Sequence, residues 1–516
     1  MSSDSLRMII GFALIMVILI LWQVLLPQRR QPVSQPQPAP AVGEPETVAV
    51  AAVLKPAEFI VPETTFFLEN QFLRLELSSR GGAIKSCYLK KYSVQLVPEK
   101  QTILGTEEIS HLPPTGFNLS ESTVAFSYLT SEGILTKTWK LGGDYSLDLI
   151  LELPGENTVL TFDARAGINL TENNVKEDLA NFHFYAHNQG KIHQIAANSL
   201  RKKPFVTAAD WVGLKSKYFF LALVSKDSRF DSCRAEVLDD GRIGFKAEVR
   251  AAGKEKGFLV YLGPVEYNRL KSFGLGFENV VSLGWLKPIA LGILYLLRLF
   301  FTIVRNWGGA IVLFSILMKV AFYPLTRTQT RQMRQLQLLQ PKIEELKKKY
   351  KNDPQTLNQE TMRLYQMYKV NPVSGCLPLL VQMPVFFALY TVLRNFIELR
   401  GAGFILWLKD LSQPDTLFGH LPSGIPLVGG FAIGLLPILM GASFIAQNLL
   451  TATDKRNWAM TIIFPIFITA IFLNLSSGLQ LYWFIYNILS IWESLIATKG
   501  GVIWQRFRKT PNLGVS

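Results

Sequence analysis

The pattern of hydrophobic and polar positions divides the chain into apolar ends and a strand-like middle. Residues 8–26 carry no charge and a single Gln. At 1.5 Å per residue, a helix of this length measures about 28 Å and spans the hydrocarbon core of a bilayer. We interpret residues 1–26 as an uncleaved transmembrane anchor. A cleaved signal peptide is the alternative, but the apolar run is too long for its core and no small-residue cleavage site follows closely.

The next two segments are expected outside the bilayer. Residues 27–62 contain eight Pro and lack hydrophobic periodicity, which predicts a flexible or extended linker. From 63 to 283, short runs alternate apolar and polar side chains, as in Leu147, Leu149 and Leu151, and Gly, Asn or Asp residues separate the runs. Such runs predict a large β-sandwich.

After residue 284 the apolar runs become long enough for helices. We expect a five-helix transmembrane core within 307–497, which with the first anchor makes about six transmembrane helices. The apolar candidates in this core are 308–325, 373–396, 427–448, 458–474 and 479–497.

A further apolar run, 288–304, either spans the membrane or lies along its surface. We prefer an interfacial amphipathic helix within 284–306. Pro288 can begin such a helix, Arg298 can extend its charge to the headgroups, and Trp285 and Trp307 suit the headgroup level.

The polar stretch 326–371 predicts a helical hairpin. Its first arm carries apolar residues at spacings of three and four, as in a coiled coil, and these are Met333, Leu336, Leu339, Ile343, Leu346 and Tyr350. Asp353 as N-cap and Pro354 at the first helical position then restart the helix.

Charge sets the expected topology. The chain has a net charge of +14, but residues 63–283 contain 26 Lys/Arg and 26 Asp/Glu, so the excess lies in the hydrophobic ends. The stretch 326–371 has ten basic and four acidic residues and should be cytoplasmic. Counting crossings from there puts the tail 498–516 and both termini in the cytoplasm and the β-domain outside.

Catalytic and metal-binding motifs are not found. The five His and three Cys form no CxxC or HExxH spacing, and neither a GxxxxGK[ST] loop nor a GxSxG elbow occurs. The sequence therefore predicts neither an enzyme nor a nucleotide-driven motor, and no metal or cofactor. Cys87 and Cys233 both fall in the predicted outside domain, and their spacing leaves open whether they pair.

Lys319 is the most informative residue, because it lies within the apolar run 308–325. A charge at the bilayer centre costs on the order of 2.5–3.5 kcal/mol even on the lenient insertion scale. That cost falls if the group faces a water-filled cavity. The alternative is that Lys319 extends to the cytoplasmic surface, which lies about six residues away.

Polar side chains on other predicted helices support a cavity. In the last helix they recur at spacings of three and four, which places them on one face: Gln480, Trp483, Asn487, Ser490 and Ser494. Ser315 shares a face with Lys319, and Gln382 interrupts the third candidate span. Converging faces would line a hydrophilic groove, whereas the plainer alternative is hydrogen bonding between helices.

The hairpin carries a basic face. Its members are Arg327, Arg331, Arg334, Lys347, Lys348 and Lys349. This face suits ribosomal RNA or lipid headgroups, or it is simply solvated and sets topology.

Several ordered motifs resemble the YidC/Oxa/Alb family of membrane-protein insertases over essentially the full length. They include Asn306-Trp307-Gly308, Phe322-Tyr323-Pro324-Leu325-Thr326, Gly375-Cys376-Leu377-Pro378, Gln382-Met383-Pro384 and Ser477-Gly478-Leu479. Residues 63–283 look like the periplasmic β-supersandwich of the Gram-negative type, with Gly81-Gly82-Ala83-Ile84 and Tyr261-Leu262-Gly263-Pro264.

The resemblance implies insertion and folding of inner-membrane proteins, without nucleotide, alone or beside the Sec translocon. The implied partners are nascent membrane proteins, the Sec translocon (SecYEG and SecDF), the ribosome and membrane lipids, with no DNA, and a functional monomer is expected. Substrate-contacting positions of the family map onto Ser315, Tyr482 and Trp483. Lys319 stands where many members have Arg, which keeps the charge but loses the bidentate fork.

Two other functions remain as alternatives. A small-solute secondary transporter would use the same polar face but predicts internal repeats, and none is seen between the halves. A sugar-binding β-domain is the third reading, although no convergent aromatic and carboxylate cluster stands out there.

Overall fold

The structure is a computed structural model with two compact units. It describes residues 63–155, 158–202, 204–251, 253–368, 370, 377–422, 430–451 and 459–508. The predicted anchor 1–26, the linker 27–62 and residues 509–516 of the predicted tail 498–516 lie outside these residues. The hairpin unit includes Pro324–Pro378, and the core unit comprises Ile60–Tyr323, Leu379–Asn448 and Ala459–Ser516.

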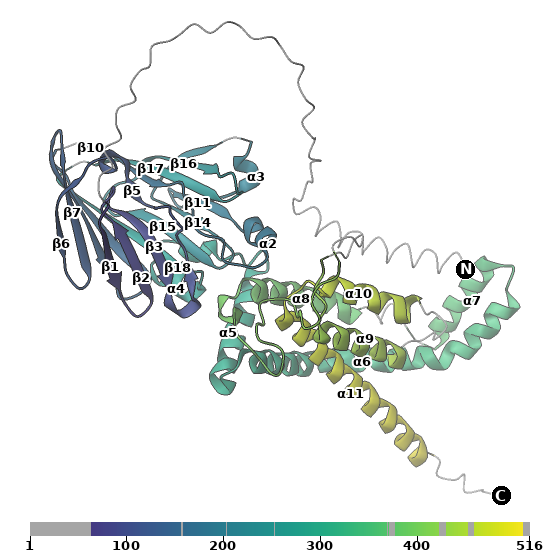
Figure 1. The fold of residues 1–516 in the computed structure, drawn as a ribbon. Coiled ribbons are helices and arrows are strands. Elements are labelled where there is room, and N and C mark those ends of the chain that lie inside the picture. The colour runs from purple at the N-terminus through teal and green to yellow at the C-terminus, as the bar shows by residue number, and fades with distance from the viewer. Residues whose placement is uncertain are drawn as a thin grey trace, which may run out of the picture. The chain divides into compact units, whose positions relative to one another are not determined.

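The β-domain of the core unit, residues 63–283, contains three antiparallel sheets (Figure 1). The four-stranded sheet has the order β1 (Thr65–Glu69), β2 (Leu73–Ser78), β3 (Ala83–Leu89), β4 (Val94–Gln95). The five-stranded sheet has the order β13 (Phe205–Ala209), β16 (Phe230–Val237), β17 (Ile243–Ala251), β10 (Thr158–Ala164), β5 (Gly105–Thr106). The nine-stranded sheet has the order β12 (Lys191–Ala196), β11 (His183–Asn188), β14 (Trp211–Lys215), β15 (Phe219–Ser225), β18 (Glu255–Pro264), β9 (Ser146–Glu152), β8 (Gly133–Leu141), β7 (Thr123–Thr130), β6 (Pro114–Leu119).

The nine-stranded sheet packs against the other two. The Tyr128 hydroxyl on β7 donates to the Ser79 carbonyl at 2.6 Å, and the rings of Phe162 on β10 and Phe258 on β18 lie 4.8 Å apart. Alternate residues of β9 are buried, as its sequence pattern predicts. The expected β-sandwich is therefore confirmed. Short helices complete it: α2 (Val175–Ala180), α3 (Ala197–Leu200) and α4 (Tyr267–Ser272).

A buried lysine fixes the first turn of this domain. Lys137 on β8 donates to the carbonyls of Gly81 at 3.1 Å and Leu104 at 2.7 Å, and to the Thr106 hydroxyl at 2.9 Å. Burial holds its pKa well below the ordinary lysine value. Gly82 has a φ of +56°, and a Cβ there would lie 2.7 Å from the Lys137 Cδ, so both backbone and space require glycine.

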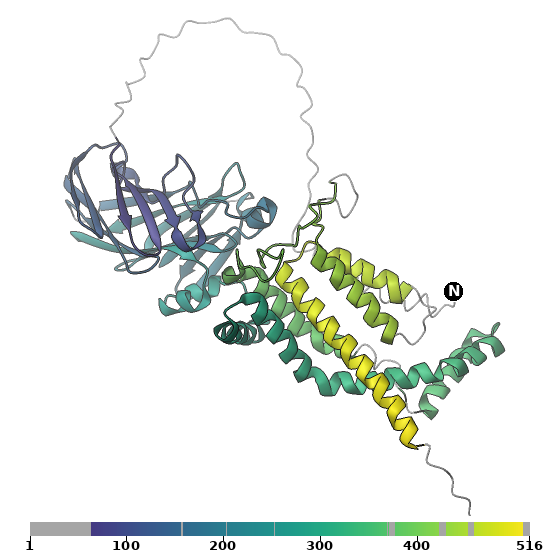
Figure 2. The same ribbon diagram turned by 60° about the horizontal axis from the view of Figure 1, so that its bottom comes forward.

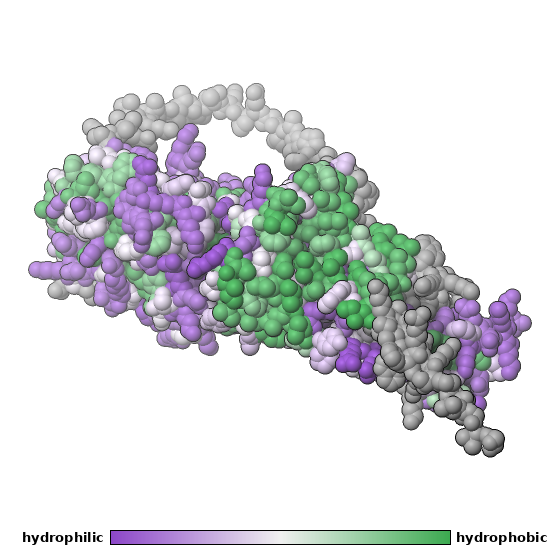
Figure 3. All heavy atoms as spheres, turned by 90° about the horizontal axis from the view of Figure 1, so that it is seen from below, coloured by the Kyte–Doolittle hydropathy of each residue, from purple (hydrophilic) through white to green (hydrophobic). Residues whose placement is uncertain are grey.

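Helices follow the β-domain where apolar runs predict them. They are α5 (Lys287–Val304), α6 (Trp307–Lys349), α8 (Leu377–Asn395), α9 (Leu435–Thr451), η6 (Ala459–Ile463), α10 (Phe464–Phe472) and α11 (Ser477–Arg508). Among the described residues, α5 and α6 are long and apolar enough to cross a membrane, and Leu435–Leu450 and Thr461–Phe472 are shorter apolar helices. The count of about six crossings stays a prediction. The surface over this helical part is mostly hydrophobic (Figure 3).

Three of the expected helix boundaries are wrong. The last span, predicted at 479–497, belongs to α11, which continues to Arg508 and so into the predicted tail. The span predicted at 308–325 and the first hairpin arm form one 43-residue helix, α6, which continues through Pro324 and Pro341. Each proline deletes only one intrahelical bond, so a long helix with its other bonds intact can continue. The span predicted from 427 begins instead at Leu435. The Asp415 carboxylate accepts a hydrogen bond from the Leu436 N–H at 2.8 Å and so caps this end of the helix.

The hairpin unit has the predicted apolar seam. Leu336, Leu339 and Ile343 of α6 cluster with Leu364 of α7 (Pro354–Met367) and with Val370. The Asp353 carboxylate accepts the Thr356 N–H at 3.1 Å, which confirms it as the N-cap, and Pro354 begins the helix. Of the basic face, Arg327, Arg331, Lys347, Lys348 and Lys349 are exposed and Arg334 is half-buried.

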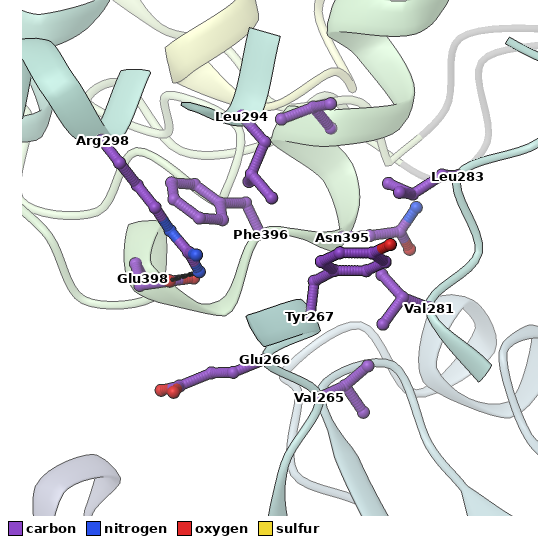
Figure 4. A pocket seen from close by; sticks show the side chains of 11 residues that line it. Val265, Glu266, Tyr267, Val281, Leu283, Leu294, Arg298, Asn395, Phe396 and Glu398 are labelled. Carbon is purple, nitrogen blue, oxygen red and sulfur yellow. Dashed lines mark hydrogen bonds and ion pairs between the residues drawn. The ribbon is translucent and has the colours of Figure 1, made fainter. Parts of the chain in front are cut away.

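Arg298 on α5 does not extend alone to the headgroups as expected. It forms an ion pair of 2.6 Å with Glu398, which follows α8 in η5 (Ile397–Leu399) (Figure 4). The pair lines a pocket of about 20 Å³, with Tyr267 and Asn395 opposite, which is room for about one water. Burial raises the pKa of Glu398, although Arg298 counteracts that rise. Trp307, expected at the headgroup level, stacks on Phe301 at 4.1 Å.

Candidate functional site

Three helices of the core unit contribute the predicted polar side chains. Lys319 and Ser315 lie one turn apart on α6, Gln382 lies on α8, and the remaining residues lie on α11. Figure 2 shows α11, in yellow, beside α6. Because α11 presents its polar residues every three or four positions, one face of it contacts α6, α8 and α9 in turn.

Lys319 meets α11 through three contacts. Its Nζ donates to the Ser490 hydroxyl at 2.8 Å, pairs with the Glu493 carboxylate at 2.7 Å, and lies 5.0 Å from the centre of the Tyr486 ring. The Lys319 and Glu493 side chains are 11% and 14% exposed. The Lys319 side chain is therefore mostly buried, and its charge is paired with that of Glu493.

Two further hydrogen bonds join α11 to α8 and α9. The Gln382 amide donates to the Tyr482 hydroxyl at 2.7 Å, and the Asn487 amide donates to the Ser443 hydroxyl at 3.2 Å. Gln382, Tyr482 and Asn487 are all buried. The polar face of α11 is thus satisfied by partners on other helices in this conformation.

Ser315 and Gln480 have local partners instead. The fully buried Ser315 hydroxyl donates to the Ile311 carbonyl of its own helix at 2.8 Å. The Gln480 amide donates to the carbonyls of Phe472 at 2.8 Å and Leu475 at 3.0 Å, which ties α11 to the end of α10. The structure does not bring these two residues into the Lys319 cluster. The Gln480 side chain instead stabilises the turn between α10 and α11.

Trp483 presents an aromatic wall beside these residues. Its half-buried ring packs against Phe386 on α8 at 5.3 Å and Phe472 on α10 at 5.4 Å. Its indole N–H is buried and has no hydrogen-bond acceptor among the described residues. A buried indole N–H normally finds a partner, so this donor keeps an unused hydrogen-bonding capacity in this conformation.

Sequence reasoning missed Glu493, Tyr486 and Ser443. Glu493 lies three residues after Ser490, on the same stripe of α11, and is an acid in an otherwise apolar segment. The argument made for Lys319 applies equally to Glu493, because a second charge within the membrane costs a similar free energy unless it is paired. Ser443 carried no such signal, because a single Ser in an apolar helix is ordinary.

A second polar cluster joins the β-domain to the end of α8. Arg400 donates to Glu172 at 2.8 Å and to the carbonyls of Tyr92 and Thr171, both at 3.1 Å. Arg394 pairs with Glu177 at 3.2 Å. Burial raises the pKa of Glu172 despite Arg400. Burial also acts to raise the pKa of Glu177, but nearby cations outweigh it and hold that pKa below its ordinary value.

The histidines and cysteines of the β-domain have structural surroundings. His187 contacts the Asp210 carboxylate at 2.9 Å and stacks on Trp211. Cys87 and Cys233 are both buried and not bonded to each other. Within the described ranges, no three His, Cys, Asp or Glu residues gather as a metal site would require.

Comparisons with known proteins assign the family. The 60Kd inner membrane protein profile matches residues 299–502, and the YidC periplasmic domain profile matches residues 117–296. A membrane protein insertase YidC of Pelobacter propionicus is 34% identical over 463 residues, covering 82% of this chain and 84% of that protein. The Syntrophus aciditrophicus protein of the same name is 31% identical and covers 91% of each chain.

A crystal structure of an active YidC insertase overlaps 85% of this chain and 95% of its own, at 19% identity and a TM-score of 0.41. That overlap is loose, and the assignment depends on the sequence matches instead. With two profiles in the expected order and relatives aligned over more than four-fifths of their length, the chain belongs to the YidC family of membrane protein insertases.

Proposed function

We propose that the chain inserts membrane proteins through the polar residues gathered around Lys319. The observation that carries this proposal is the contact of Lys319 with Ser490 and Glu493 between helices whose other surfaces are apolar. Two charges within an apolar bundle are costly to maintain, and such residues generally mark the path of a polar substrate.

The step follows from partitioning. The polar tail of a substrate exchanges contacts with the side chains of α6 and α11, so it need not face about 30 Å of hydrocarbon unaided. The apolar segment of the substrate moves into lipid along the hydrophobic surface of the helices. Burial of that segment drives the step without nucleotide.

The topology belongs to the same proposal. The β-domain lies in the periplasm, both termini and the basic hairpin lie in the cytoplasm, and α5 lies along the membrane surface. The exposed face of α5 supports this placement, because Tyr295, Leu299 and Ile303 are half or more exposed while Leu294 and Leu297 are buried. The hairpin is available to the ribosome or anionic lipid, and the Sec translocon is a partner for larger substrates.

Photo-crosslinking tests the site. A photoreactive residue replaces Ser315 or Trp483, and a stalled nascent chain of a small single-span protein is presented. We expect adducts from both positions. Val320 provides the matched control, because it is 65% exposed on α6 and should contact lipid instead. If neither Ser315 nor Trp483 gives an adduct, the proposal is contradicted.

Reconstitution separates insertion from transport. In proteoliposomes the chain should insert the single-span protein, and solute uptake should stay at the level of empty vesicles. Lys319→Arg should retain insertion, whereas Lys319→Glu should impair substrates with acidic tails. Equal insertion of all substrates by Lys319→Glu would exclude charge attraction.

A further inference from the structure

The Lys319 cation already has a carboxylate partner inside the protein. Its Nζ lies 2.7 Å from a Glu493 oxygen, and the two side chains are 11% and 14% exposed. The local charge of the pair is therefore close to neutral. An acidic residue of a substrate meets an occupied cation and not an open one.

The hydroxyl of Ser490 allows an exchange at this cation. Ser490 accepts from Lys319 at 2.8 Å and donates to the Tyr486 carbonyl of its own helix at 2.8 Å. Because neither contact involves Glu493, Ser490 can hold the ammonium while one carboxylate replaces another. When Glu493 moves away from the Lys319 ammonium, a substrate carboxylate restores the charge balance, whereas a neutral side chain does not.

The position of Glu493 suits a carboxylate that moves. Its side chain is 14% exposed, so the carboxylate is not fully enclosed by the helices around it. Because a buried cation without a counter-charge is costly, the exchange of one carboxylate for another is the step that keeps Lys319 paired.

We propose that Glu493 is a resident counter-ion, which an acidic residue of an inserting segment must displace from Lys319. This inference rests on the proposed function and adds the specificity of the same site. Glu493 competes with acidic tails and does not compete with neutral ones. It thereby sets how strongly the site discriminates between them, and it acts as a positioning residue for the Lys319 ammonium.

The test compares two substrates in proteoliposomes that contain the full chain. One small single-span protein carries Asp residues in its tail, and its twin carries Asn at the same positions. A photoreactive residue at Trp483 reports the contact with each tail. In Glu493→Gln we expect adducts with the Asp tail to rise about tenfold at limiting substrate, with adducts of the Asn tail unchanged.

Two further variants keep the result decisive. Glu493→Asp retains the charge and should behave like the parent chain. The double variant Lys319→Ala/Glu493→Gln should treat Asp and Asn tails alike. If Glu493→Gln leaves the ratio of Asp-tail adducts to Asn-tail adducts unchanged, whether both yields stay the same or both rise equally, the inference alone is overturned. If the parent chain crosslinks neither tail, the proposed function fails and this inference fails with it.

Discussion

Arg400 offers a sharp test of how the β-domain is attached to the helices. Its guanidinium makes three contacts of 2.8–3.1 Å, to Glu172 and to the carbonyls of Tyr92 and Thr171. The Arg400 and Glu172 side chains are 20% and 4% exposed. Removing one partner of a buried pair costs about 3–5 kcal/mol, because the other charge stays buried alone. Water can reach Arg400 in part, so we take the lower end, about 3 kcal/mol.

Hydrogen exchange measures this cost locally. In Arg400→Ala, amides of residues 170–180 should lose protection by about a hundredfold, since about 1.4 kcal/mol corresponds to a factor of ten. Arg74→Ala is the matched control, because Arg74 and its partner Glu69 are 59% and 51% exposed and 3.8 Å apart. It should leave protection unchanged. A change of less than about threefold in Arg400→Ala would refute the reasoning, because an energy of about 3 kcal/mol predicts far more.

The same variant has a defined pH dependence. The folded pKa of Glu172 lies above its unfolded value, so the folded state binds more protons between the two values and stability falls as pH rises through that interval. Loss of Arg400 raises that pKa further. The loss of protection should therefore become smaller as pH falls and Glu172 takes up a proton, because the neutral carboxyl group needs no cation. An equal loss at all pH values would show that Glu172 is not the group left unpaired.

Three other predictions concern the remaining parts. Gly82→Ala should lower the melting temperature of the β-domain by several degrees, because the added Cβ meets the Lys137 side chain. Gly143→Ala is the control and should leave the melting temperature unchanged, because the added Cβ enters open space. Equal melting temperatures for the two variants would contradict this prediction. Tyr482→Phe leaves the buried Gln382 amide without its acceptor and should cost about 1–3 kcal/mol in detergent unfolding. Replacing residues 347–349 by Gln should weaken ribosome co-sedimentation at low salt and matter less at high salt, and a salt-independent effect would argue against electrostatics.

Periodicity predicted the elements of this fold well. Strict alternation gave β9, and the spacing of three and four gave both the hairpin seam and the polar face of α11. These patterns are local consequences of the strand and helix periods, so a single sequence carries them. Boundaries were less predictable: nothing local reveals that α6 continues past Pro324, because the choice depends on the surroundings of the helix.

Partners across the structure were the least predictable. Lys319 stood out as a charge in an apolar run, but its pairing with Glu493 joins residues 174 positions apart. The Arg298–Glu398 and Arg400–Glu172 pairs join residues that lie 100 and 228 positions apart. A charge in an apolar segment predicts that some partner or water exists, and only the fold identifies it. The role of each site residue stays a prediction until substrate contact is measured.

Accessibility of the Lys319 cluster tests the central claim most directly. Ser490→Cys is introduced into a chain whose native cysteines are replaced by Ser, and a charged, membrane-impermeant maleimide is added to inverted or right-side-out vesicles. We predict labelling from the cytoplasmic face only, with Val320→Cys unlabelled because it faces lipid. Absence of labelling from either face, or labelling from the periplasmic face alone, would contradict a polar path that opens to the cytoplasm.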